Sequence, residues 1–185
     1  MVAASKPHEG NRLVQNLKKV VQQADRSITW AVFADDDPLM LRRLGEALGK
    51  ESAAIIPAPQ NLWSCGGHAL EDAVVWAINE LAVVSVVLVG SSAAGVPVSD
   101  PILAGRAAAD ESENTLLASV RASERKRRLA QEDFSQQVQS LVNVHEVGHR
   151  VARGSLALHC LFYRAESGVF TAFDPRDGSF RALIN

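Results

Sequence analysis

The chain has 185 residues, 47% of them hydrophobic, so its length and composition predict one domain with a sizeable core and exclude two. Its 19 basic and 21 acidic residues give a net charge of -2, which argues against nucleic acid or a membrane surface as partners. Two cysteines, no apolar leader and no apolar run longer than about half a membrane span lead us to expect a soluble, cytoplasmic protein.

The N-terminal half of the chain alternates β-branched runs with segments of helical period, a pattern typical of a parallel sheet covered by helices. We expect residues 1–26 to form a helical arm and residues 27–98 to form a β-α-β-α-β core. The first strand is expected at residues 27–33, before a cluster of three aspartates that ends it. Asp37 followed by Pro38 then predicts the start of a helix, because the aspartate caps free amides and proline suits the first helical position.

The second and third strands of this core are expected at residues 53–56 and 83–89, with a helix over residues 68–81 between them. Pro57 and Pro59 follow the second strand and exclude its continuation as a central strand. The third strand is almost entirely apolar, which predicts that it is buried on both faces of the sheet.

The C-terminal half is expected to hold helices over residues 100–154 and an edge hairpin over residues 155–174. The basic stretch SERKRR at residues 123–128 is interpreted as a solvated helix surface. The hairpin strands are expected at residues 156–164 and 169–173, with antiparallel pairing at one edge of the sheet. The predicted fold class is therefore α/β, with a central, mostly parallel sheet flanked by helices and an antiparallel edge strand.

The segment HEVGH contains His145, Glu146 and His149 in the H-E-x-x-H pattern of zinc metalloproteases. In that pattern two imidazoles bind zinc from one face of a helix and the carboxylate acts as a base. A catalytic zinc needs a third protein ligand, and the downstream candidates are His159 and Glu166. Neither suits the role, because His159 falls within an expected strand and the spacing differs from that of the metzincin proteases.

The favoured interpretation of the same segment is structural. Apolar residues precede the histidines at helical spacing, so both histidines fall on one stripe of a packed helix and are expected to be partly buried. A zinc metalloprotease is kept as the second alternative function. The stripe comprises Val138, Leu141, Val142, His145, His149 and Ala152.

Three segments, taken in order, resemble the β-class carbonic anhydrases. The first is VFADDDP at residues 32–38, where that family has a strand ending in C-x-D-x-R. The second is IIPAPQNLW at residues 55–63 and then residues 68–96, similar to the family's extended segment, its helix and the strand that ends in G-H-x-x-C-G. The third is residues 151–174, similar to the family's closing helix and hairpin. The resemblance covers about 150 of the 185 residues and implies the β-carbonic-anhydrase fold in a homodimer.

The residues that would hold zinc depart from the family pattern. The resemblance places the family's three zinc ligands, two cysteines and a histidine, at Ala34, Ser91 and Ala94. Methyl groups cannot bind zinc, and a neutral serine hydroxyl is a poor substitute for thiolate or imidazole. The family's Asp and Arg dyad falls on Asp36 and Pro38, so the guanidinium is lost. We therefore expect no metal cofactor and no zinc-dependent CO2 hydration, which would make the chain a pseudoenzyme.

The same positions form a candidate vestigial pocket at the carboxyl ends of the strands, where open parallel sheets bind ligands. Its small residues and hydroxyls suit a small polar ligand, or they simply pack where the metal ligands were lost. A protein partner is the other ligand expected of a non-catalytic member of the fold. The pocket residues are Ala34, Asp36, Ser91, Ser92, Ala94 and Gly95.

The first alternative function is a divergent metal-dependent lyase or hydrolase. Cys65 and His68 stand at C-x-x-H spacing and, with Asp36, would supply three ligands for a relocated metal. Two ligands at close spacing also arise by chance, with Cys65 as a small buried residue and His68 as a residue at the start of a helix.

Overall fold

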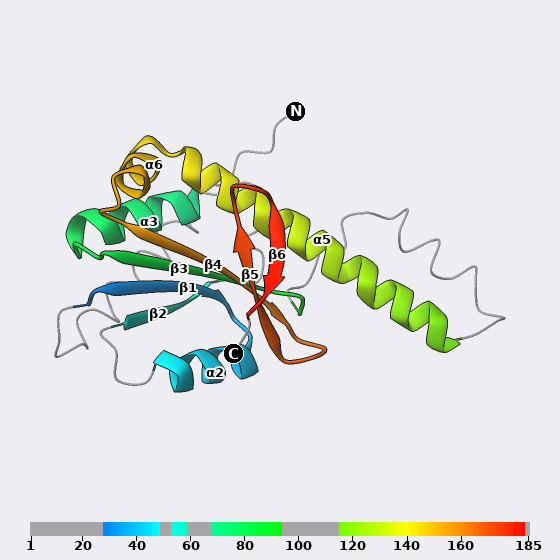
Figure 1. Ribbon diagram of the computed structural model, residues 1–185. Coiled ribbons are helices and arrows are strands. Elements are labelled where there is room, and N and C mark those ends of the chain that lie inside the picture. The colour runs from blue at the N-terminus through cyan, green and yellow to red at the C-terminus, as the bar shows by residue number, and fades with distance from the viewer. Residues whose placement is uncertain (1–27, 49–52, 59–67, 94–114, 184–185) are drawn as a thin grey trace, which may run out of the picture.

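The computed structural model describes residues 28–48, 53–58, 68–93 and 115–183, and these residues form a six-stranded sheet between helices (Figure 1). The strands are β1 (Trp30–Asp35), β2 (Ala53–Ala58), β3 (Ser85–Ser91), β4 (Ala157–Arg164), β5 (Val169–Asp174) and β6 (Ser179–Ala182). They lie in the order β2-β1-β3-β4-β5-β6. The first four strands of this order are parallel, whereas β5 is antiparallel to β4 and β6 is antiparallel to β5.

Helices cover both faces of the sheet. On one face lie α3 (Ala69–Glu80), α5 (Thr115–Asn143) and α6 (His145–Ala152), and on the other lies α2 (Pro38–Leu48) (Figure 1). This arrangement confirms the predicted α/β class, the mostly parallel central sheet and the antiparallel edge. The sequence pattern does not predict β6, which adds a second antiparallel strand beyond the expected hairpin.

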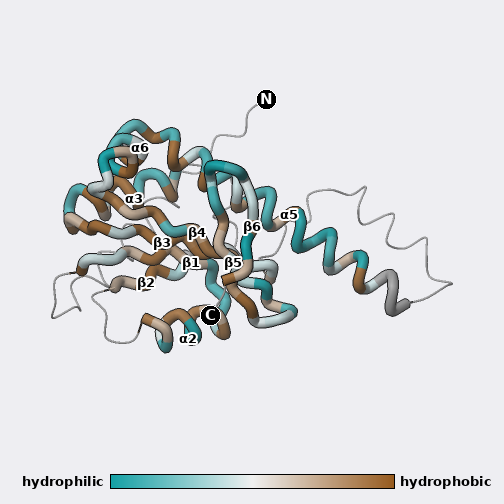
Figure 2. The backbone as a smooth tube through the Cα atoms, viewed as in Figure 1, coloured by the Kyte–Doolittle hydropathy of each residue, from teal (hydrophilic) through white to brown (hydrophobic). Residues whose placement is uncertain are grey.

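The alternation of side chains along each strand divides the core between the two faces. Along β1, Phe33 packs in the larger apolar cluster, with α3 and α5, whereas Val32 and Ala34 pack in the smaller cluster, with α2. β3 is buried along its whole length because it lies between β1 and β4 and has helices on both faces. Figure 2 shows apolar colours along the central strands, whereas most of α5 is hydrophilic.

The ends of two strands differ from the sequence-based expectation. β1 continues to Asp35, because its parallel pairing continues through Ala34 opposite Val89 and Asp35 opposite Ala58. β2 continues through Pro57, since it is the edge strand of the sheet and the missing proline N–H costs no ladder bond on the outer side.

The helical region expected at residues 100–154 is divided in two. α5 ends one residue before Val144, which is extended (φ -63°, ψ 120°) and precedes α6. Residues 1–26 and 94–114, where an arm and further helix were expected, lie outside the described residues. Side chains 119–126 of α5 are exposed, and this end of the helix extends beyond the sheet (Figure 1). Among the described helices, none combines the length and apolar character needed to cross a bilayer.

Candidate functional site

The carboxyl ends of β1 and β3 meet beside the start of α2. Asp35, the last residue of β1, is 1% exposed. Its Oδ2 accepts a 2.7 Å hydrogen bond from the backbone N–H of Ser91, the last residue of β3. The parallel pairing of β1 with β3 thus brings the aspartate cluster and the serines to one end of the sheet, the end at which open parallel sheets bind ligands.

Asp37 connects the start of α2 to this end of β3. Its Oδ1 accepts hydrogen bonds from the N–H groups of Leu39 and Met40, both at 3.0 Å, which confirms the predicted helix start. Its Oδ2 accepts a 3.4 Å hydrogen bond from the hydroxyl of Ser91. The same hydroxyl accepts a 3.1 Å hydrogen bond from the N–H of Ala93. The oxygen of Ser91 is therefore already engaged within the protein, as donor and as acceptor.

Ser92 joins the end of β3 to the turn after β4. Its hydroxyl donates to Oε2 of Glu166 at 2.6 Å and accepts from the N–H of Ala165 at 2.9 Å. Its own N–H donates to the carbonyl oxygen of Tyr163 at 2.9 Å. Ser92 is itself buried, and these three bonds hold the ends of two neighbouring strands together.

Glu166 is surrounded by positive charge. Its Oε1 lies 3.5 Å from Nη1 of Arg127 and 3.6 Å from Nε of Arg164. Burial alone would raise the pKa of Glu166 above the ordinary 4.5. The hydrogen bonds from Ser92 and Arg127 and the charge of Arg164 outweigh burial, so the pKa of Glu166 lies below its ordinary value. The site therefore carries an ionised carboxylate at neutral pH.

Two residues of the basic stretch contact this site. The side chain of Arg127 is 29% exposed and pairs with Glu166, and Nζ of Lys126 donates to the carbonyl oxygen of Ala93 at 3.5 Å. Residues 123–126 and 128 are exposed, as the prediction of a solvated surface requires, whereas Arg127 is only partly exposed. The reason is tertiary, because α5 packs over the carboxyl end of β3 at this point.

Tyr163 adds a buried polar group to the same end of the sheet. Its side chain is fully buried among the residues on the α2 side, with its ring 4.9 Å from that of Phe170. The guanidinium of Arg43 lies 5.9 Å from the centre of the ring. The hydroxyl of Tyr163 has no hydrogen-bond partner among the residues that the structure describes. Buried hydroxyls normally form a hydrogen bond with protein, water or a bound molecule, so this hydroxyl is a candidate to bind a polar ligand.

The pocket residues predicted from the sequence are only partly placed. Ala34, Ser91 and Ser92 are buried at the carboxyl ends of their strands. Ala94 and Gly95 lie outside the described residues.

Asp36, the carboxylate expected in the pocket, is exposed. The carboxylates that contact the serines are those of Asp35, Asp37 and Glu166, which the predicted pocket did not include. Successive side chains of a strand point to opposite faces, which separates Asp35 from Asp36. This alternation could have identified Asp35 from the sequence. Glu166 carries no such signal, because it comes from the turn after β4, 74 positions beyond Ser92.

The donor atoms at the three zinc-ligand positions do not fit zinc. Ala34 offers a methyl group, the hydroxyl of Ser91 is engaged by neighbouring groups, and Ala94 has only a methyl group by its identity. Zinc in proteins requires thiolate, imidazole or carboxylate ligands. Across the described ranges, no three His, Cys, Asp or Glu side chains are grouped so that they could hold a metal ion.

Of the three ligands of the proposed relocated metal site, Asp36 and His68 are described. Cys65 lies outside the described residues. His68 is at the start of α3, where its side chain is 84% exposed and its Nδ1 lies 2.6 Å from Oε2 of Glu71. The hydrogen bond and the charge of Glu71 raise the pKa of His68 above its ordinary value. Glu71 in turn accepts a 2.6 Å hydrogen bond from the hydroxyl of Ser140, so it ties the start of α3 to α5.

The two histidines of the H-E-x-x-H segment lie on α6 and are exposed, so the prediction that they are partly buried is wrong. The rings of His145 and His149 stack with their centroids 5.8 Å apart. The break at Val144 starts a new helix, and the residue of α6 that is buried in the core is Val147. The stripe expected from the sequence therefore does not continue through the second helix.

The downstream candidates for a third protease ligand lie away from α6. His159 stacks on Trp30, at a centroid distance of 5.8 Å, on the face of the sheet that α2 covers, whereas α6 packs on the opposite face. Glu166 follows the carboxyl end of β4, whereas α6 precedes its amino end. Glu146 lies 3.5 Å from Arg150 of its own helix. The fold therefore does not bring these residues together as a protease site.

Comparison with known proteins identifies the fold but no sequence relative. No protein-family model matches the sequence, and no curated protein matches it at a significant level. Among solved structures, the β-carbonic anhydrase CcaA is 18% identical with a TM-score of 0.55, over 91% of this chain and 90% of its own. A tetrameric β-carbonic anhydrase from Sordaria macrospora is 18% identical with a TM-score of 0.56, over 94% and 92%. The enzyme CafA of Aspergillus fumigatus is 18% identical with a TM-score of 0.55, over 89% and 85%.

The chain thus has the fold of the β-class carbonic anhydrases, as the sequence resemblance implied. The likeness extends over about nine-tenths of the chain. At this level of identity the likeness concerns architecture, and function has to be argued from the site.

Proposed function

We propose that this chain is a non-catalytic protein built on the β-carbonic-anhydrase scaffold, a pseudoenzyme that binds a small polar molecule at the carboxyl end of its sheet. The observation that carries the proposal is the replacement of the metal-binding groups. Where the resemblance places a histidine ligand, the hydroxyl of Ser91 is bonded to Asp37 and to the N–H of Ala93. Where it places the first cysteine, Ala34 is fully buried.

The loss of these ligands removes the chemistry of CO2 hydration. Attack on CO2 needs hydroxide at neutral pH, and zinc supplies it by lowering the pKa of bound water from about 15.7 to about 7. A carboxylate that acts as a general base on ordinary water contributes typically about 10²- to 10⁴-fold. Two of the three nearby aspartates are also committed, since Asp35 accepts from Ser91 and Asp37 caps α2. What remains does not suffice for a carbonic anhydrase.

The same end of the sheet retains features suited to binding. The buried hydroxyl of Tyr163 lacks a described partner, and the residues that end β1 and β3 include the small side chains of Ala34 and Ser91. Charges of both signs lie at this end of the sheet. Asp36 and Glu166 are acidic, and Lys126 and Arg127 are basic. A neutral or zwitterionic polar molecule fits this mixed field better than a strongly charged one.

We also propose that the chain self-associates, as a homodimer in the cytoplasm. The Sordaria macrospora enzymes of the same fold are tetrameric, and the resembled family pairs its subunits. Light scattering after size exclusion measures this directly. A mass near 40 kDa would support the dimer, because one chain has a mass of 19.9 kDa, and a mass near that of one chain would contradict it.

The deciding experiment measures metal content and CO2 hydration on the same purified protein. We expect elemental analysis to find no stoichiometric zinc, and stopped-flow hydration to stay at the uncatalysed rate after zinc is added. Stoichiometric zinc that is lost in Cys65→Ala would instead establish the relocated site. Zinc that is lost in His145→Ala would establish the protease-like site.

A matched gain-of-ligand variant tests the assignment of positions. Ala34→Cys, Ser91→His and Ala94→Cys together restore the three ligand types of the family at the positions that the resemblance gives. We expect this variant to bind about one zinc per chain, whereas Asp36→Asn in the parent chain leaves metal content unchanged.

A further inference from the structure

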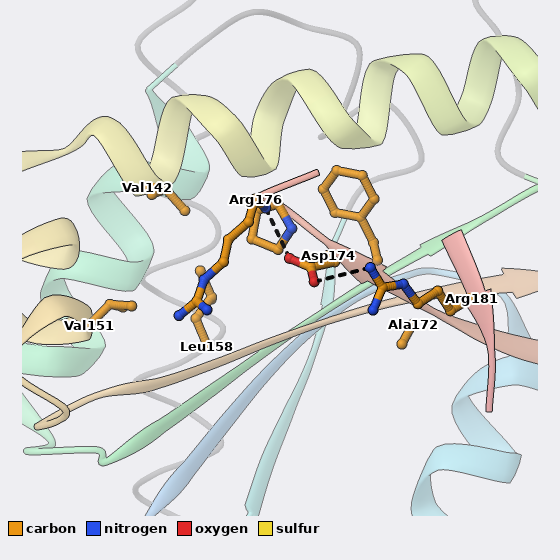
Figure 3. A pocket seen from close by; sticks show the side chains of 9 residues that line it. Val142, Val151, Leu158, Ala172, Asp174, Arg176 and Arg181 are labelled. Atoms are coloured by element: carbon orange, nitrogen blue, oxygen red, sulfur yellow. Dashed lines mark hydrogen bonds and ion pairs between the residues drawn. The ribbon is translucent and has the colours of Figure 1, made fainter. Parts of the chain in front are cut away.

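A pocket lies on the face of the sheet opposite to α2, between α6 and the strands of the C-terminal edge (Figure 3). Its volume is about 630 Å³, within the range of small-molecule sites, and none of its lining comes from the candidate site described above. It lies near the amino end of β4, whereas the serines and Glu166 lie beyond the carboxyl end. The lining residues are Val142, Val151, Leu158, Ala172, Phe173, Asp174, Pro175, Arg176 and Arg181.

The wall of this pocket is mainly apolar and comes from several elements. Val142 closes it from α5, Val151 from α6 and Leu158 from β4, and the end of β5 supplies Ala172 and Phe173. A surface of this kind, hollowed and only partly buried, gains free energy when an apolar body displaces water from it.

The charged residues of the pocket are unequally paired. Arg181 is neutralised by two carboxylates, with Asp174 at 3.8 Å and Asp177 in direct contact. Asp174 also accepts a 3.0 Å hydrogen bond from the backbone N–H of Arg176. The guanidinium of Arg176 has no ion-pair partner within the described ranges, and Figure 3 shows it extended across the apolar wall beside Leu158.

We propose that this pocket binds a small amphipathic carboxylate, with its hydrocarbon body on the apolar wall and its carboxylate on the guanidinium of Arg176. One planar guanidinium matches one planar carboxylate through two parallel N–H···O bonds. A dianion such as a phosphate monoester is disfavoured relative to a carboxylate, because the carboxylate of Asp174 lines the same pocket and repels a double charge more strongly.

Calorimetric titration with octanoate and with its neutral analogue octanamide tests the proposal on the full chain. We expect octanoate to bind and octanamide to bind at least about tenfold more weakly. Arg176→Gln should lower the affinity for octanoate by about tenfold and leave that for octanamide unchanged. Arg153→Gln, which removes an exposed arginine at the end of α6 that does not line the pocket, is the matched control and should bind as the parent does.

The position of the ligand is read independently from methyl NMR spectra. Octanoate should shift the methyl signals of Val142, Val151 and Leu158, whereas those of Leu44, buried under the opposite face, should not move. Absence of octanoate binding, equal affinity for octanoate and octanamide, or shifts confined to the α2 face would each overturn the proposal. Because the pocket shares no residue with the serine site, its failure would leave the proposed function untouched.

Discussion

The carboxylate of Asp35 and the backbone N–H of Ser91 form a 2.7 Å hydrogen bond between the ends of β1 and β3. Both residues are 1% exposed, so the bond is shielded from water. It joins the end of β1 to Ser91, one of the positions at which the sequence resemblance places a zinc ligand. A structural bond therefore occupies the position on which the family resemblance would place zinc chemistry.

Removal of this acceptor should destabilise the protein. Asp35→Ala leaves the buried N–H of Ser91 without its carboxylate partner, and we expect a loss of about 1–3 kcal/mol in the free energy of unfolding. Urea denaturation at pH 7 measures the loss. Asp36→Ala is the matched control, since that side chain is exposed, and it should change the stability by less than about 0.5 kcal/mol. Equal losses in the two variants would show that the contact with Ser91 contributes nothing specific.

The charge of Glu166 should make stability depend on pH. Its pKa is lower in the folded protein than the ordinary 4.5, so its contribution is present above that value and is lost as the pH falls through the folded-state pKa. At pH 7 we expect Glu166→Gln to lower stability by about 0.5–1 kcal/mol, as is usual for partly exposed ion pairs. The difference between the parent and Glu166→Gln should shrink steadily below pH 4.5. A difference that stays constant from pH 7 to pH 3 would contradict this account.

The packing of α5 on the sheet should not tolerate a side chain at Gly90. A Cβ at this position would lie 2.6 Å from Cδ2 of Phe134, whose ring is fully buried, so Gly90→Ala should cost about 1–3 kcal/mol. Gly45→Ala, on the open surface of α2, meets nothing within 4 Å and should stabilise the helix by up to about 1 kcal/mol. The midpoint temperature of thermal unfolding should therefore fall for Gly90→Ala and rise for Gly45→Ala. In the double variant Gly90→Ala with Phe134→Leu, part of the cost of the added methyl should disappear.

The thiol of Cys160 should be unreactive in the folded protein. Burial, with a smaller contribution from the charge of Asp174, raises its pKa to about 12, and the thiolate is the reactive species. In a Cys65→Ala background at pH 8, we expect a disulfide reagent to label Cys160 only as fast as the protein unfolds. Ala152→Cys, at an exposed position of α6, should react rapidly in the same background. Fast labelling of Cys160 without denaturant would show that this part of the core opens readily.

The main elements of the fold could be predicted because their signals are local. The apolar run at β3, the Asp37 and Pro38 start of α2 and the alternation of strands with helices each arise within a few residues of sequence. The continuation of β2 through Pro57 was not predictable in this way, because it depends on whether the strand lies at the edge of the sheet. The same limit explains His145 and His149, whose exposure results from the break at Val144.

By itself, the sequence determined which chemical groups these positions offer, because the identities of Ala34, Ser91 and Ala94 exclude thiolate and imidazole at each of them whatever the fold. Only the tertiary structure decided what those groups contact. Ser92 reaches Glu166 across 74 positions and Arg127 reaches Glu166 across 39, and such pairs depend on strand order and on the path of α5. Side-chain periodicity reports the face on which a residue lies and carries no information about the distant segment that will cover that face.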